Sequence, residues 1–108
     1  MVHVIFDIND EIDLNDFIQT TKIEEELEVI HEKNFNGTSM IVEVFINSIP
    51  AIALITPVII AKIKKKNLSN LKIEGDKIEI DNVSEKFIKE LLEKTLSNKS
   101  DKNHDTNR

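Results

Sequence analysis

The most concentrated group of potential ligands in this sequence is the acidic segment that begins at Asp7. Counted from Asp7 as the first position, oxygen-bearing side chains fall where a calcium-binding EF-hand loop has them, at Asn9, Glu11 and Asp13. However, Ile12 stands where that loop needs a glycine, and Ile18 stands where it needs a bidentate glutamate. We therefore interpret the segment as a turn whose acids cap a helix, and not as a calcium site.

The histidines are the other candidate metal ligands, and they are His3, His31 and His104. No two of them have the short spacing with which one helix presents two imidazoles to zinc. His3 and His31 could bind a metal only if the fold brought them together with a carboxylate. We interpret them as strand or surface histidines, so the sequence predicts neither a metal site nor a cofactor.

Residues for nucleophilic catalysis are scarce. The chain has no cysteine, which excludes a thiol nucleophile, a thiolate metal site and a disulfide framework. Its only glycines are Gly37 and Gly75, so it has neither a Gly-x-Ser-x-Gly elbow nor a phosphate-binding loop. We expect the serines before the C-terminal tail to cap helices or to lie in turns; these are Ser39, Ser48, Ser69 and Ser84. The sequence therefore predicts a protein that is not an enzyme.

Length and charge narrow the class of protein further. The chain has 108 residues and a hydrophobic fraction of 40%, enough for one domain with one core. No lysine or arginine precedes Lys22, so we find no secretory signal and expect a cytoplasmic protein. The formal net charge is −6, which predicts that nucleic acid is not a partner.

Two charged clusters are the candidate interaction residues. The acidic one is Glu24, Glu25 and Glu26, in a segment that could face a basic partner. The basic one is Lys62, Lys64, Lys65 and Lys66, and it follows a long apolar stretch. A solvated surface is the simpler interpretation of both clusters.

The elements that must position these residues begin with a strand. Val2, Val4, Phe6 and Ile8 alternate with less apolar residues, a period of two that predicts a strand over residues 2–8. Asp13 can then cap a short helix whose apolar face holds Leu14, Phe17 and Ile18. Residues 22–33 fit either a helix that Thr21 and Glu24 cap, or a strand, and we favour the strand.

A long apolar stretch occupies residues 40–63 and contains two prolines. Pro50 suits the first turn of a helix that Ser48 caps, and Pro57 suits a kink or a new start. We predict a helix broken into residues 39–48 and 50–65, buried in the core of the domain. The alternative is a membrane span, because residues 44–61 carry no charge and a lysine-rich run follows them.

The C-terminal part of the chain predicts a hairpin and a helix. With Gly75-Asp76 as a two-residue turn, residues 71–80 would pair Ile73 with Ile78 and Lys72 with Glu79. Asn82 or Ser84 would cap a last helix with a buried stripe of Phe87, Ile88, Leu91, Leu92 and Thr95. After Leu96 no apolar residue follows, so we predict a disordered polar tail over residues 97–108.

These elements predict an α+β domain over residues 1–96. Its small mixed sheet would consist of the N-terminal strand and the C-terminal hairpin. The sheet would pack on the central Pro-broken helix and on the C-terminal helix, because each of these elements has an apolar face that needs a partner.

The order of these features resembles a known family. Gly37 is followed by Thr38-Ser-Met-Ile-Val-Glu-Val-Phe, an apolar segment that reaches Ala61-Lys-Ile-Lys-Lys-Lys, a strand pair at residues 71–80 and a helix at 83–96. In this order, residues 1–96 resemble the small effector-associated constant-component domains of bacterial conflict systems. Ser48-Ile49-Pro50 stands where that family has small, glycine-rich residues. The resemblance is also our reason for favouring a strand at residues 26–32.

The resemblance implies a non-catalytic domain that couples an effector to its partners in anti-phage or related defence. The first hypothesis is therefore a protein-interaction module, an adaptor or a small regulator that binds a protein partner such as an effector or an NTPase, or a second copy of itself. The second is an acidic inhibitor, encoded by a phage or plasmid, that occupies a basic site on a host protein through its acidic N-terminal part. The third is a small membrane protein with one span through residues 40–63.

Overall fold

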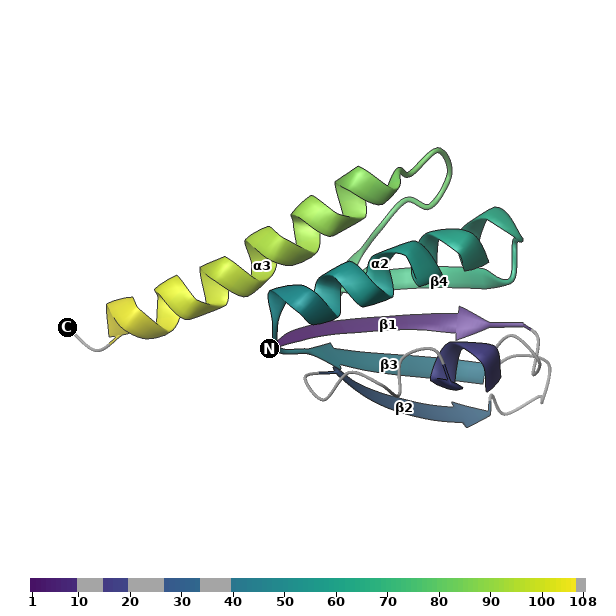
Figure 1. The fold of residues 1–108 in the computed structure, drawn as a ribbon, viewed down its shortest axis with the longest axis horizontal. Coiled ribbons are helices and arrows are strands. Elements are labelled where there is room, and N and C mark those ends of the chain that lie inside the picture. Colours follow the sequence, from purple (N-terminus) through teal and green to yellow (C-terminus); the bar gives the residue numbers. More distant parts are fainter. Residues whose placement is uncertain (10–14, 20–26, 34–39, 107–108) are drawn as a thin grey trace.

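A computed structural model describes residues 1–9, 15–19, 27–33 and 40–106 (Figure 1). In chain order the elements are β1 (Val2–Ile8), β2 (Leu27–Lys33), β3 (Met40–Ile46), α2 (Ile49–Lys64), β4 (Leu68–Ile73), β5 (Asp76–Lys77) and α3 (Glu85–Thr106). A further helical turn occupies residues 15–19. The predicted α+β class and the predicted strands at 2–8 and 26–32 are confirmed.

The strands form one five-stranded sheet in the order β2-β3-β1-β4-β5. With five strands, the sheet is larger than predicted. Every neighbouring pair of strands is antiparallel, so the sheet is not mixed. The first strand of the chain lies in the middle, between β3 and β4. Helix α2 joins these two strands and so crosses β1 on one face of the sheet (Figure 1).

That face carries the core. Alternate residues of β1 and β3 are buried, as a strand with one covered face requires. Helices α2 and α3 pack on each other, and they cover this face with Ile52, Ile55 and Ile59 from α2 and with Ile88 and Leu92 from α3. Phe17 of the helical turn at 15–19 is also buried. Its ring packs edge-on against the ring of Phe6, with 5.4 Å between the ring centroids. The predicted cap and first apolar residue of this turn, Asp13 and Leu14, lie outside the described residues.

The first half of the predicted central helix is wrong, because residues 40–46 form strand β3. Met40, Val42, Val44 and Ile46 are buried, while the residues between them are half-buried. This is the period of two that marks a strand, and β-branched residues, which favour strands, hold four of the seven positions. Apolar residues at six of the seven positions concealed the alternation, since a half-buried Ile41 or Phe45 resembles a core residue in the sequence.

The second half of that prediction is confirmed as α2. The hydroxyl oxygen of Ser48 accepts a hydrogen bond from the Ala51 N–H at 3.3 Å, and Pro50 lies in the first turn. The helix also continues through Pro57 to Lys64. Pro57 and Ala53 are both exposed, so water can reach the Ala53 carbonyl that loses its helical partner.

The C-terminal hairpin is present, but its turn lies one residue earlier than predicted, so each pairing partner differs by two residues. Ile73 pairs with Asp76 and Lys72 with Lys77, so Glu74 and Gly75 form the turn. Their φ angles are 53° and 85°, and two successive positive φ angles characterise a type I′ turn. Glycine suits the second central position of such a turn, and the pairing of Ile73 with Asp76 excludes the predicted Gly75-Asp76 loop.

Helix α3 begins as predicted and ends later. Ser84 caps it, because its hydroxyl oxygen accepts the Phe87 N–H at 3.1 Å. Ile88 and Leu92 are buried, but Phe87 is 49% exposed, so its predicted place in the stripe is wrong. The helix continues through Thr106, past Leu96, into the segment predicted to be a disordered tail.

The apolar stretch 40–63 is therefore divided between β3 and α2. Across the part of the chain that the structure describes, none of the helices combines the length and the apolar character needed to cross a membrane.

Candidate functional site

The candidate site is the face of the sheet opposite the helices. The side chains that point to it are half-buried or exposed, in contrast to the buried ones on the helix side. We call this surface the open face and define it by His3, Ile5 and Asp7 of β1, Glu28 and Ile30 of β2, Ile41, Glu43 and Phe45 of β3, Lys72 of β4 and Lys77 of β5. Strand register places these residues side by side.

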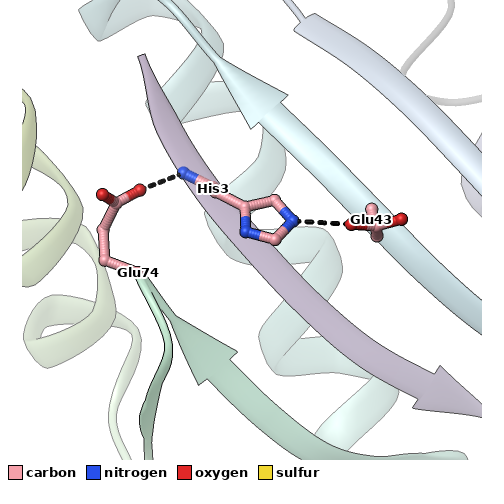
Figure 2. Close-up of polar contacts among 3 residues, drawn as sticks. All are labelled: His3, Glu43 and Glu74. Atoms are coloured by element: carbon pink, nitrogen blue, oxygen red, sulfur yellow. Dashed lines mark hydrogen bonds and ion pairs between the residues drawn. The ribbon is translucent and has the colours of Figure 1, made fainter.

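His3 is the most constrained residue of the open face (Figure 2). Its Nε2 lies 2.9 Å from Oε1 of Glu43, and its ring stacks on Phe45 with 4.9 Å between ring centroids. The backbone N–H of His3 donates to Oε2 of Glu74 at 2.6 Å, and the Glu74 N–H donates to the His3 carbonyl at 2.8 Å. His3 thus joins three strands, which is a structural role.

The geometry around His3 gives no metal site. His31, the partner considered from the sequence, lies in β2 opposite Val42, two strands away from His3. Among the residues that the structure describes, no three histidine, aspartate or glutamate side chains are grouped so that they could hold a metal ion. His3 and Glu43 therefore supply two potential metal ligands and not three, and the side chain of each is 34% exposed.

A bulge in β4 shapes the other side of the open face. The pairing of β1 with β4 shifts register between Ile5 and Asp7, and Asn70 has a φ of 55°. The Asn70 amide nitrogen donates to Oδ2 of Asp7 at 2.7 Å. Next to this bond is a shallow depression of about 440 Å³ lined by Ile5, Asp7, Ile41, Asn70, Lys72 and Lys77.

The depression is lined by both cations and an acid. Lys72 and Lys77 are directly opposite each other in the β4–β5 ladder, an arrangement in which like charges repel. The predicted register would have placed Glu79 opposite Lys72 instead. The Asp7 carboxylate lies in the same lining and accepts a hydrogen bond from the Asn70 amide. Two lysines, one carboxylate, one amide and two isoleucines therefore give the depression a mixed polar and apolar lining.

The serines singled out from the sequence lie in helix caps or in a strand, as far as the structure describes them. Ser48 and Ser84 are helix caps, as predicted. Ser69 is not in a cap or turn, because it lies in strand β4 opposite Asp7. Ser39 lies outside the described residues.

The basic cluster predicted from the sequence is split by the fold. Lys62 is 3% exposed, and its Nζ lies 3.0 Å from Oδ2 of Asp16. Lys64, Lys65 and Lys66 are exposed at the end of α2. The acidic cluster Glu24, Glu25 and Glu26 lies outside the described residues.

Sequence reasoning missed the open face, because three of its ten residues come from β3, which was interpreted as a helix. The available signal was the alternation of Ile41, Glu43 and Phe45 with buried residues. It has the same period as the alternation in β1, and the two strands pair residue for residue.

No family model, curated protein or solved structure matches this chain. We therefore infer its function from the residues of the open face.

Proposed function

We propose that this chain is a non-catalytic protein-interaction module, an adaptor or small regulator that acts in the cytoplasm. The observation that carries the proposal is the open face. A sheet with one face covered by helices leaves the other face to solvent or to a partner, and apolar side chains on such a face favour a partner.

The composition of the open face supports this function. Ile5, Ile41 and Phe45 on the two inner strands β1 and β3 and Ile30 on the edge strand β2 give it apolar side chains, and Ile30 is 46% exposed. Charged residues lie among them, with Glu43 on β3 and Lys77 on β5. Apolar and charged side chains together on one exposed face are the usual composition of a protein interface.

The proposed setting is a bacterial or phage conflict system, with an effector or an NTPase as partner. This setting rests on the order of elements that resembles the effector-associated constant-component domains. The segments on which the resemblance depends contain strands β4 and β5 and helices α2 and α3. The central segment, however, begins with strand β3. The acidic-inhibitor alternative depends on Glu24, Glu25 and Glu26, and no described contact favours it.

The proposal predicts that changing Ile30 to glutamine removes partner binding and leaves the fold intact. Ile30 is exposed, so the substitution should have little effect on folding, while the loss of an apolar contact at an interface should reduce partner recovery about tenfold. The tagged chain is expressed in its own host, cross-linked and purified, and the partners are quantified by mass spectrometry.

Ile49→Gln is the matched control, because Ile49 is also 46% exposed but lies at the start of α2, away from the open face. We expect the control to bind partners as the unchanged chain does. Equal recovery with both variants contradicts the assignment to the open face. If the unchanged chain recovers no protein, the interaction module itself is wrong. Loss of phage resistance on deletion of the gene would test the setting.

A further inference from the structure

One row of residues crosses the open face at the level of Ile5. Ile5 of β1 pairs with Glu43 on one side and with Lys72 on the other. One strand further out, Glu43 pairs with Ile30, and Lys72 pairs with Lys77. Across the five strands the row therefore reads Ile30, Glu43, Ile5, Lys72, Lys77, with an acid and a base at equal distances from the central strand.

The three inner positions of this row are complementary to themselves. When two copies stack face to face about a two-fold axis parallel to β1, the axis exchanges the two sides of the sheet. Ile5 then meets Ile5 of the second copy, and Glu43 meets Lys72 of the second copy. At the ends of the row Ile30 meets Lys77, and two residues along β1 Asp7 meets Asp7, so the favourable charge contacts are those of Glu43 with Lys72. The reverse contact, Lys72 with Glu43, forms by symmetry, as any two-fold interface requires.

We propose that the partner of the open face is a second copy of this chain, stacked on it to form a sandwich of two sheets. The inference rests on the proposed function, because it names the occupant of the same face. The stacking places Glu43 of the second copy near Lys72 and Lys77, two cations that repel each other across the β4–β5 ladder. The Glu43 carboxylate can accept a lysine as well as His3, because it has several lone pairs.

The size of the face sets the strength of this dimer. Four strands spaced by about 4.8 Å and roughly 23 Å long present a face of roughly 440 Å² per copy, which is below the roughly 500 Å² per partner of a stable specific interface. The dimer should therefore be weak and sensitive to salt, because part of its stability comes from ion pairs at a solvated rim.

The test is a charge exchange, followed by sedimentation velocity and native mass spectrometry on the full chain. Glu43→Lys and Lys72→Glu should each weaken dimerisation at least about tenfold, because each puts like charges together at two symmetric contacts. The double variant E43K/K72E restores both contacts with reversed polarity, so it should dimerise nearly as well as the unchanged chain. A mixture of the two single variants should form heterodimers for the same reason.

Glu90→Lys and Lys89→Glu are the matched controls, since they make the same charge changes on exposed positions of α3. Both should dimerise as the unchanged chain does, and circular dichroism shows that each variant is folded. A monomer at every concentration overturns the inference, and so does a dimer that the single variants leave intact or that the double variant fails to restore. A monomer that still binds a host partner through Ile30 leaves the proposed function standing, so the two failures are distinguishable.

Discussion

At the scale of single residues, Lys62 shows how burial changes what a charge does. Its sequence context groups it with three other lysines, but its side chain is 4% exposed and its Nζ meets Asp16. The partner carboxylate is 66% exposed, so the ion pair joins a buried lysine to a carboxylate that water reaches. The apolar stem of the lysine is what the core surrounds, as lysines commonly bury their methylene groups.

We therefore predict that Lys62→Ala lowers the free energy of unfolding by about 1–3 kcal/mol, mostly through lost packing. Asp16→Asn should cost at most about 1 kcal/mol, because solvent screens an exposed pair. Urea denaturation followed by circular dichroism measures both. Lys64→Ala, an exposed neighbour on α2, is the control and should change stability by less than about 0.5 kcal/mol. Equal effects at Lys62 and Lys64 would contradict the burial of Lys62.

At the scale of elements, the C-terminal hairpin depends on its turn. Gly75 has a φ of 85°, and a Cβ added there would meet no atom within 4 Å. Gly75→Ala therefore tests conformational strain alone, without a steric clash. We expect it to lower the free energy of unfolding by about 1–2 kcal/mol, the cost of a left-handed conformation for a residue with a side chain.

Thermal and urea denaturation measure this loss. Asp76→Ala changes the next residue, which is also exposed but has no positive φ, and it should be nearly neutral. If Gly75→Ala were as stable as the unchanged chain, the turn would not be the type I′ turn described above.

The elements also show how far the sequence predicts the structure. Strand β1 was predictable because its alternation is clean, and α2 and α3 were predictable at their starts because Ser48 and Ser84 are standard helix caps. Strand β3 was not, because Ile41 and Phe45 give the open face an apolar character that conceals the period of two. The candidate site was lost with it, since its row of residues depends on the pairing of Glu43 with Ile5.

At the scale of the whole molecule, α3 gives the chain its length. The molecule measures 48 × 28 × 26 Å, and α3 extends away from the sheet toward the C-terminus (Figure 1). The last apolar residue that packs against the core from this helix is Leu96. No apolar residue follows Leu96, so we expect the final turns to be held by helical hydrogen bonds and not by the core.

We predict that deletion of residues 99–108 removes helical circular dichroism signal but changes the free energy of unfolding by less than about 0.5 kcal/mol. Leu92→Ala in the same helix is the positive control and should cost about 2–5 kcal/mol, because Leu92 is fully buried. A truncated chain that unfolds at clearly lower urea concentration would show that these last turns contribute to the packed domain.

The central position of β1 has a consequence for how the chain is made. Both neighbours of this strand are synthesised after it, and β4 begins only at Leu68. At about 5–20 residues per second, a ribosome takes roughly 3–12 seconds to make the intervening chain. Until β3 and α2 have been made, Val2, Val4, Phe6 and Ile8 have neither a strand partner nor a helix over them. The sheet around β1 can therefore be completed only late in synthesis, after β4 has been made.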